Sequence, residues 1–303
     1  MKNNEYTIYK IPKRNGGYRI IEAPNPELKK KQEEILLELY KQVPVSPFCH
    51  GGVPFRSIVT NAFSHVKQDI VASVDIVDFF PSIFKLFVTS KLKKLTNNTQ
   101  LIEDVDRYCF LNGRLPQGAP TSPYLANIAL IDFDWQLASF CCNQGIQYTR
   151  YFDDITISGP RHLHKLIAVI IRKVIPYMLD YKFNFKTHKT KIISGGRKLV
   201  CGVVVNEKLN VPRAYRRKLR AEIHQKGLTN SVTIGKYNYV EMVRNTDISK
   251  LKTTCQIYFE WLKNRRDYAL LIDDEDLYKR ILFVIRNAKR KYKQYKLNNN
   301  YLD

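Results

Sequence analysis

The sequence lacks three patterns that would have assigned it to a large class of proteins. No apolar run approaches the roughly 18 residues of a membrane-spanning helix, and the opening Met1-Lys2-Asn3-Asn4 does not resemble a signal peptide. The 6 cysteines show no C-x-x-C spacing, so we expect reduced thiols rather than zinc ligands or a disulfide framework. These absences predict a soluble protein of the cytoplasm with no membrane partner.

Acidic residues are also few beside the basic ones. The chain has 50 Lys and Arg against 28 Asp and Glu, a formal net charge of +22. Such a charge attracts phosphate backbones and makes the binding of nucleic acid strongly dependent on salt. The composition therefore predicts a polyanionic partner.

The length and the patterning indicate more than one subdomain. At 303 residues and 44% hydrophobic content, the chain exceeds the usual size of a single core. Residues 6–23 are typical of a hairpin with Asn15-Gly16 at its turn, and the apolar spacing from Leu28 to Tyr40 predicts a helix. From Val71 to Val205 strands alternate with helices, and beyond that segment the pattern is helical and basic. We expect an α+β or α/β core and two or three subdomains.

The run Tyr151-Phe152-Asp153-Asp154 places two adjacent carboxylates at the tip of a predicted hairpin. Its flanks are rich in Tyr, Thr and Ile, which favour strands. Because neighbouring side chains on a strand point to opposite faces, only a tight turn lets Asp153 and Asp154 reach one point. An ordinary acidic turn is one interpretation, since Asp is common in turns. A divalent cation between the two carboxylates is the other.

A third carboxylate favours the metal interpretation. The strand-like run Val71–Val74 delivers Asp75 at its end, before Pro81 begins the next element. Phosphoryl transfer by two metal ions needs carboxylates around two ions roughly 3.5–4 Å apart. We therefore expect Asp75, Asp153 and Asp154 to hold two Mg²⁺ ions, with Mn²⁺ as a substitute.

Several further segments follow in a fixed order. They are Arg19–Pro24 with Leu28-Lys29 and Gln32, the N-A-x-x-H run within Ser57–His65, Asp75–Phe80, Leu115–Pro123, Tyr151–Asp154 and Lys189–Ile192. In order and spacing they resemble the conserved segments of reverse transcriptases, and the N-A-x-x-H run resembles the bacterial retron-type enzymes in particular. The resemblance covers the chain from about Tyr18 to Gly202 and is weaker beyond.

The resemblance implies a right-hand polymerase of the α+β class. Its fingers would comprise residues 1–70 with part of 85–114. Its palm, an antiparallel sheet plus helices, would comprise residues 71–205. Its basic helical thumb would comprise residues 206–303.

The resemblance also implies an activity and partners. The activity is RNA-directed DNA polymerisation, in which a primer hydroxyl attacks the α-phosphate of a dNTP. The partners are a structured non-coding RNA of the msr-msd type as template and primer, the RNA–DNA product known as msDNA, and an effector protein in anti-phage defence. The alternatives are another defence-associated reverse transcriptase, including one that polymerises without a template, and a non-catalytic RNA-binding module.

The expected site residues divide into groups by role. The catalytic residues are Asp75, Asp153, Asp154 and Lys189. The dNTP-binding residues are Arg19, Ile76, Phe80, Gln117 and Gly118. The nucleic-acid-binding residues are Asn61, His65, Tyr151, Cys201, Gly202, Arg213, Arg216, Arg217 and Arg220. The metal ligands are Asp75, Ile76, Asp153 and Asp154.

Some of these residues have a more definite role. The guanidinium of Arg19 offers a forked donor to triphosphate oxygens. The resemblance makes Phe80 the ring that clashes with a ribose 2′-OH. It makes Lys189 the donor of a proton to the leaving pyrophosphate, an effect of roughly 10²–10⁴-fold. The basic segment from Arg213 would hold phosphates without reading sequence.

The chain departs from the family pattern at two places. The family has Asn four residues before Thr190, where this chain has Lys186, so the register of Lys189 is open. Retron enzymes show V-T-G where this chain has Val200-Cys201-Gly202. Cysteine keeps the size of threonine but loses a good hydroxyl hydrogen bond. If the segment binds primer or priming RNA, its contacts differ, whereas a packed turn would change little.

Overall fold

The computed structural model of the protein describes residues 5–13, 16–179, 183–185, 190–228 and 231–264. Lys189 and the last part of the expected thumb, residues 265–303, lie outside these ranges. All six cysteines are free, as the sequence predicts. None of the described helices is long and apolar enough to cross a membrane.

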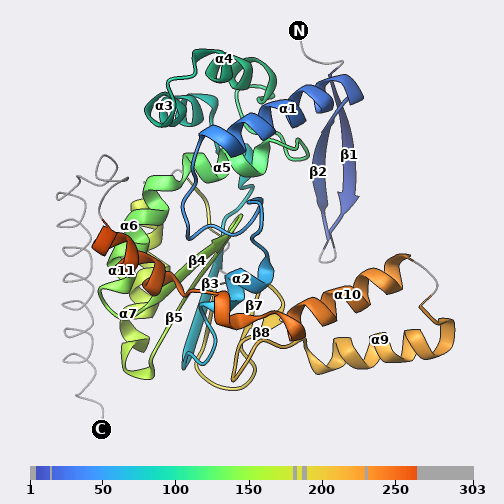
Figure 1. The fold of residues 1–303 in the computed structure, drawn as a ribbon, viewed down its shortest axis with the longest axis vertical. Coiled ribbons are helices and arrows are strands. Elements are labelled where there is room, and N and C mark those ends of the chain that lie inside the picture. The colour runs from blue at the N-terminus through green and yellow to red at the C-terminus, as the bar shows by residue number, and fades with distance from the viewer. Residues whose placement is uncertain (1–4, 14–15, 180–182, 186–189, 229–230, 265–303) are drawn as a thin grey trace.

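The amino-terminal hairpin and the first helix are confirmed. Strand β1 (Tyr6–Pro12) pairs antiparallel with β2 (Tyr18–Pro24), and helix α1 (Pro26–Gln42) follows directly. The side chain of Asn25 accepts a hydrogen bond from the backbone N–H of Leu28, which caps the first turn of α1. In Figure 1 the hairpin stands to one side of the body, beside the start of α1.

The central sheet has four antiparallel strands in the order β4-β5-β3-β6. The strands are β3 (Ile70–Asp75), β4 (Gln147–Tyr151), β5 (Asp154–Gly159) and β6 (Lys191–Ile193). An antiparallel sheet with helices on its faces makes the fold α+β, as expected. The predicted hairpin of β4 and β5 is also present, and it forms one edge of the sheet.

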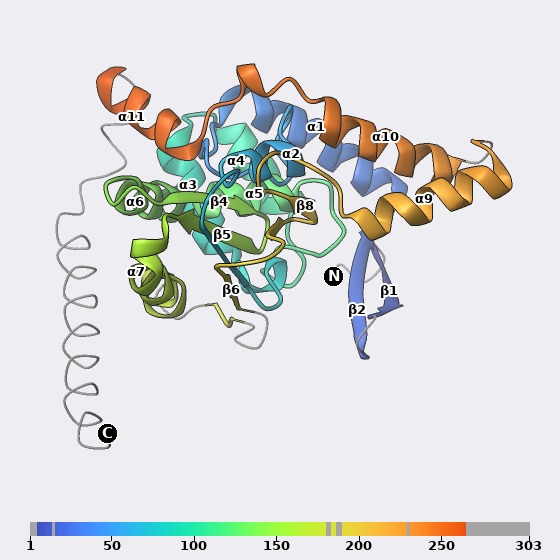
Figure 2. The same cartoon turned by 90° about the horizontal axis from the view of Figure 1, so that it is seen from below.

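Most helices lie around one face of this sheet and at its upper end (Figures 1 and 2). The remaining α-helices are α2 (Ile58–Phe63), α3 (Lys85–Leu95), α4 (Thr99–Tyr108), α5 (Ser122–Ala129), α6 (Ile131–Cys142), α7 (His164–Val169), α8 (Ile175–Met178), α9 (Arg213–Lys226), α10 (Ser231–Asn245) and α11 (Thr254–Asn264). The 3₁₀ helices are Phe80–Ser82, Arg161–Leu163 and Ile248–Lys250, and a π-helical turn spans Ile170–Val174.

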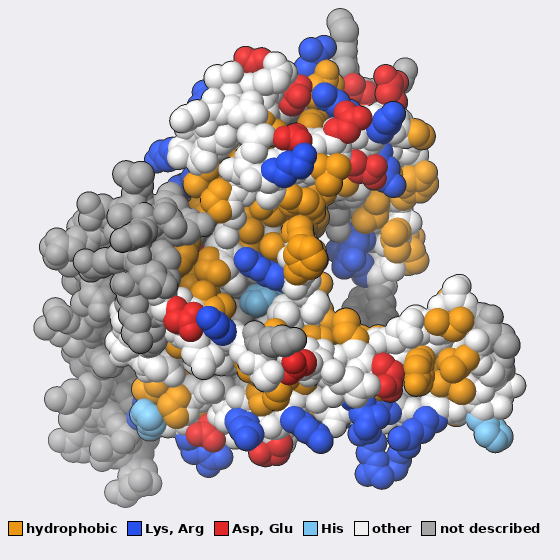
Figure 3. All heavy atoms as spheres, viewed as in Figure 1, with side chains coloured by type: hydrophobic (Ala, Val, Ile, Leu, Met, Phe, Trp, Pro, Cys, Tyr) orange, Lys and Arg blue, Asp and Glu red, His pale blue; other side chains and the backbone are white. Residues whose placement is uncertain are grey.

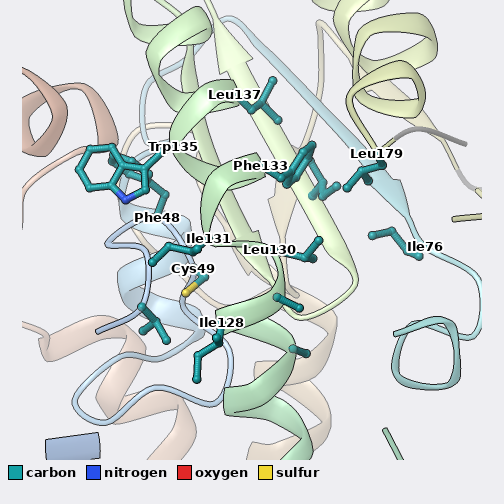
Figure 4. Packing of buried hydrophobic residues seen from close by; sticks show 14 of the residues in the cluster. Phe48, Cys49, Ile76, Ile128, Leu130, Ile131, Phe133, Trp135, Leu137 and Leu179 are labelled. Atoms are coloured by element: carbon teal, nitrogen blue, oxygen red, sulfur yellow. The ribbon is translucent and has the colours of Figure 1, made fainter. Parts of the chain in front are cut away.

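The two faces of the sheet differ in chemistry. Paired residues of antiparallel strands point to the same face, so one face carries Asp75, Asp154, Thr156 and Ser158. The opposite face packs against α6 and α7 in the main core, where Phe48 and Trp135 meet edge to face with ring centroids 4.9 Å apart. Figure 4 shows this core around α5 and α6.

Helix α2 covers the polar face of the sheet together with a third hairpin. Strands β7 (Leu199–Val200) and β8 (Val203–Val204) pair antiparallel, and a second hydrophobic cluster joins them to α2 and to α9 and α10. Helices α9 and α10 project from the body as a pair (Figures 1 and 2). The polar face of the sheet is therefore covered by elements from distant parts of the chain.

Two histidines near this face are buried and should make the fold sensitive to acid. Burial lowers the pKa of His65 to about 3, and burial with the charge of Arg56 lowers that of His50 to about 3. A depressed pKa means that the unfolded state binds more protons between pH 6.5 and 3, so stability falls as pH falls through that window.

We therefore expect each histidine to cost about 2 kcal/mol of unfolding free energy between pH 7 and pH 5. Denaturant unfolding of the parent, His65→Gln and His224→Gln at both pH values measures this. His65→Gln should lose about half of the pH-dependent change, whereas His224→Gln, at an exposed site on α9, should keep it. An unchanged pH dependence in His65→Gln would contradict the assignment.

Candidate active site

The structure brings the three predicted carboxylates to one end of the central sheet. Asp75 at the end of β3 lies opposite Asp154 at the start of β5 in the strand register. Residues in this relation point to the same face, with Cβ atoms about 4.5–5.5 Å apart. The backbone N–H of Ile76 donates to the carbonyl of Asp153 at 3.1 Å. This bond ties the end of β3 to the turn that carries the second and third carboxylates.

The turn between β4 and β5 has an unusual backbone. Tyr151 pairs with Asp154, so Phe152 and Asp153 form a two-residue loop, and the φ of Phe152 is 54°. A bulky residue rarely adopts this left-handed region, which glycine normally occupies in such loops. A Cβ on Gly51 would lie 2.7 Å from Cδ1 of Phe152. The loop that contains Gly51 and Gly52, called the glycine loop below, therefore packs closely against the aromatic ring of Phe152 and holds the turn in place.

Beneath the turn lies a fully buried ion pair. Arg150 donates from Nε and Nη2 to the two carboxylate oxygens of Asp134 on α6, at 2.8 and 2.7 Å. Its Nη1 donates to Asn127 Oδ1 at 3.0 Å and to the carbonyl of Phe152 at 3.1 Å. Both charged side chains are inaccessible to solvent. The guanidinium thus connects two helices with the backbone of the carboxylate-bearing turn.

The sequence-based prediction of site residues does not include Arg150 or Asp134. One signal was available, because residues 148, 150, 155 and 157 alternate onto the same face as apolar neighbours. An arginine in a buried strand position requires a partner. The identity of that partner, on a helix 16 residues earlier, does not follow from local pattern.

The carboxylates repel one another in the absence of a cation. Burial, and then the negative charges of Asp153 and Asp75, raise the pKa of Asp154 to about 6. A cluster whose members disfavour each other's ionised form is a good receptor for positive charge. Within the described part of the chain, no group of three or more His, Cys, Asp or Glu side chains is placed so that it could hold a metal ion. The donors suit a hard cation that also keeps water and substrate oxygens as ligands.

The loop that carries two of the predicted dNTP contacts, Gln117 and Gly118, is joined to β2. The main chain of Gln117 makes two hydrogen bonds to Glu22 of β2. Its carbonyl accepts from the backbone N–H of Glu22 at 2.8 Å, and its N–H donates to the side-chain Oε2 of Glu22 at 3.1 Å. A Cβ at Gly118 would lie 2.7 Å from the Glu22 carbonyl oxygen, so this position needs glycine. Arg19 is exposed on β2. The loop and the strand that carries Arg19 are therefore fixed to each other.

Two predicted dNTP contacts lie next to the turn. Phe80 is half-buried, and its ring centroid lies 6.2 Å from that of Phe152 and 5.3 Å from that of Phe79. Phe79 is a core residue. The side chain of Ile76 is fully buried, so Ile76 can contribute to a metal or nucleotide site only through its main chain.

Seven of the nine residues predicted to contact nucleic acid have some accessible surface. Arg213, Arg217, Arg220 and Gly202 are exposed, and Tyr151, Cys201 and Arg216 are half-buried. In Figure 3 basic side chains gather along the lower edge of α9 in this view. Tyr151 packs edge to face on Phe152 with centroids 4.9 Å apart. Tyr151 therefore belongs to the wall of the carboxylate turn.

The other two, Asn61 and His65, need a correction. Both are fully buried. The ring nitrogens of His65 bond Ser158 Oγ and Thr149 Oγ1, each at 2.7 Å, and Asn61 Nδ2 donates to Cys201 Sγ at 3.4 Å. The expected contact with nucleic acid is wrong for these side chains, because α2 presses them onto the polar face of the sheet. Their motif instead joins α2 to β4, β5 and the β7–β8 turn.

Comparison with known proteins gives a consistent picture. The family described as "Reverse transcriptase (RNA-dependent DNA polymerase)" matches residues 11–209. The "Retron Mx65 reverse transcriptase" of Myxococcus xanthus is 35% identical over 81% of this chain and 63% of its own length. The "Retron Mx162 reverse transcriptase" of the same organism is 35% identical over 73% of this chain and 52% of its own. The chain thus spans less than two thirds of these relatives.

A third relative covers nearly the whole chain. The "Retron Ec86 reverse transcriptase" of Escherichia coli is 28% identical over 97% of this chain and 84% of its own length. A solved apo telomerase from Candida tropicalis aligns with 68% of this chain and 55% of its own at 13% identity and a TM-score of 0.48, which is too distant to carry an argument.

The Arg150–Asp134 pair should dominate the stability of the site. Replacing Arg150 by Met leaves the Asp134 charge buried without its partner, and we expect a loss of about 3–5 kcal/mol in unfolding free energy. The double variant Arg150→Met/Asp134→Leu should recover part of the loss, because neither charge remains. The control Lys41→Ala, which breaks an exposed pair with Glu38, should leave the unfolding free energy close to that of the parent, because water screens such a pair. Denaturant titration measures the unfolding free energy of each variant. Equal losses of unfolding free energy in Arg150→Met and Lys41→Ala would refute the proposed role of the buried ion pair.

Proposed function

Because the chain belongs to the reverse transcriptase family, and its curated relatives are retron enzymes, we propose that it is an RNA-directed DNA polymerase of the retron type. The observation that carries the proposal is the register of Asp75 opposite Asp154, with Asp153 in the intervening turn. The proposed reaction is attack of a primer hydroxyl on the α-phosphate of a dNTP. The family generally uses divalent metal ions.

Asp75, Asp153 and Asp154 are the proposed holders of two Mg²⁺ ions, with Mn²⁺ as a substitute and the main chain of Ile76 as a further ligand. When bound, such ions activate the attacking hydroxyl and stabilise the leaving oxygen. Burial, and then the charges of Asp153 and Asp75, raise the pKa of Asp154, and the repulsion among the three acids supports this assignment. The protein's own part is to keep the carboxylates in place through the bond from Ile76 to Asp153 and through the buried Arg150.

The dNTP would bind between the carboxylates and the fingers, where Arg19, Gln117 and Gly118 are the proposed contacts. The two hydrogen bonds between the main chain of Gln117 and Glu22, one to its backbone N–H and one to its side chain, support a fixed distance from the loop to the strand of Arg19. Phe80 is the proposed gate against ribonucleotides, because its ring packs beside the carboxylate turn. General-acid assistance by Lys189 is a proposal from the sequence alone.

We further propose the division into fingers (1–70 with part of 85–114), palm (71–205) and thumb (206–303). The exposed arginines of α9 support a thumb that holds the template–primer duplex by its phosphates. A net charge of +22 supports the same partner. We propose that the reaction takes place in the cytoplasm.

The retron relatives support a finer proposal about the template. By that analogy the template and primer are a structured non-coding RNA of the msr-msd type, the product is an RNA–DNA hybrid, and an effector protein completes an anti-phage system. A reverse transcriptase that polymerises without a template is the rival. These assignments rest on relatives that are 28–35% identical to the chain.

The catalytic proposal predicts that Asp153→Asn and Asp154→Asn abolish dNTP incorporation. Each variant removes one negative charge from the cluster and should leave RNA binding within about 2-fold of the parent, because the carboxylates contribute no attraction for phosphates. Primer extension and filter binding measure the two properties. The control Asp106→Asn makes the same chemical change on α4, where Asp106 pairs with Lys85, and should extend primers normally. Full activity in Asp153→Asn and Asp154→Asn would overturn the mechanism.

The template proposal predicts the nucleic acid that copurifies with the protein. Sequencing it from cells that carry the native locus should return one structured RNA joined to DNA complementary to part of it. In cells that express Asp154→Asn the same RNA should appear without the DNA. A mixture of unrelated cellular RNAs, or DNA with no matching template, would exclude the retron assignment.

A further inference from the structure

The turn between β7 and β8 brings a thiol to one of the three carboxylates. Val200 pairs with Val203, so Cys201 and Gly202 form a two-residue loop, with φ values of 47° and 82°. Two successive left-handed residues define a type I′ turn, which favours Asn-Gly. Cysteine carries a Cβ that disfavours this conformation. A strained residue of this kind persists only where its surroundings hold it.

Helix α2 supplies the apolar part of those surroundings. Val59 and Ala62 of α2 are buried in the same cluster as Val200 and Val203. His65, just beyond α2, bonds both strands of the carboxylate-bearing hairpin. The helix therefore fixes the β7–β8 turn against β4 and β5, and the position of Cys201 follows from that of the hairpin.

Two hydrogen bonds complete the surroundings of the thiol. Asn61 Nδ2, buried beneath it, donates to Cys201 Sγ at 3.4 Å. Cys201 Sγ donates in turn to Asp154 Oδ2 at 3.7 Å. Because the amide already supplies a proton to the sulfur, the single S–H proton is directed at the carboxylate. Asn61 and Cys201 thus form a chain of two donors that ends on Asp154, a proposed metal ligand.

We propose that Cys201 is a positioning residue for Asp154 in nucleotidyl transfer. Asp154 lies opposite Asp75 and next to Asp153, and their negative charges push its carboxylate away. A donor on Oδ2 offsets this repulsion and holds one orientation of the carboxylate. Cys201 touches neither substrate nor reacting atoms in this role. The inference rests on the proposed polymerase function and deepens it.

The first test compares Cys201→Ala with Cys201→Ser in single-nucleotide incorporation on an RNA template with a DNA primer. Loss of one hydrogen bond of about 1 kcal/mol predicts a roughly 5-fold lower kcat in Cys201→Ala. The KM for dNTP should stay unchanged, because the proposed nucleotide contacts are elsewhere. Cys201→Ser keeps a donor and should return to within about 2-fold of the parent.

Cys255→Ala is the matched control. Its thiol also donates a hydrogen bond, to the carbonyl of Ile146 at 3.3 Å, but at the opposite end of β4 from the carboxylate turn. This variant should keep the parent's kcat. A parent-like kcat in Cys201→Ala, a serine variant as slow as the alanine variant, or an equal loss in Cys255→Ala would overturn the proposal.

A second measurement does not depend on polymerisation. In a double-mutant cycle of thermal unfolding, Cys201→Ala should lower the midpoint in the parent and lower it less in an Asp154→Ala background, because the acceptor is already gone. Equal shifts in both backgrounds would refute the bond between the two side chains. If the parent itself incorporates no dNTP, the proposed function fails, and this cycle alone decides whether Cys201 holds Asp154.

Discussion

The buried pair of Arg150 and Asp134 is the interaction on which the site depends. Removing two charges from water costs several kcal/mol per ion, so such a pair persists only with good geometry and further hydrogen bonds. Here Asn127 and the carbonyl of Phe152 accept from the remaining guanidinium nitrogen. A slip of β4 by one residue would turn Arg150 onto the other face of the sheet and leave Asp134 unpaired. The ion pair therefore fixes which residues of β4 face the core, and with them the two-residue turn between β4 and β5 that carries Asp153.

Strained backbone occurs at both loops that reach the carboxylates. Phe152 and Cys201 each adopt a left-handed conformation, with φ of 54° and 47°. Such strain costs on the order of 1–3 kcal/mol per residue and gathers where structure around it overrides local preference. For Phe152 the surroundings are the glycine loop and Arg150. For Cys201 they are α2 and the side chains of Asn61 and Asp154.

The sequence pattern predicted those helices and strands that depend mainly on residues close to one another in the chain. The amino-terminal hairpin, α1 and the hairpin of Asp153 and Asp154 follow from apolar periodicity and turn residues, and the structure confirms them. The placement of His65 could not be predicted, because its partners Ser158 and Thr149 lie 93 and 84 residues away. The sequence motif indicates that His65 is important, whereas only the packing of α2 on the sheet shows that its side chain faces inward.

The energetics of the carboxylate end also bear on the non-catalytic alternative. An RNA-binding module gains affinity from positive charge, so acids placed together near its binding surface would weaken it. In this chain, three features nevertheless keep the three acids together. They are a buried ion pair, a strained turn and the hydrogen bond from Ile76 to Asp153. Burial, and then repulsion from the other two acids, raises the pKa of Asp154. Such an arrangement would weaken a protein that only binds RNA. It becomes useful when a cation that also binds a substrate phosphate neutralises the negative charge of the acids. The arrangement therefore favours the polymerase over the binding module.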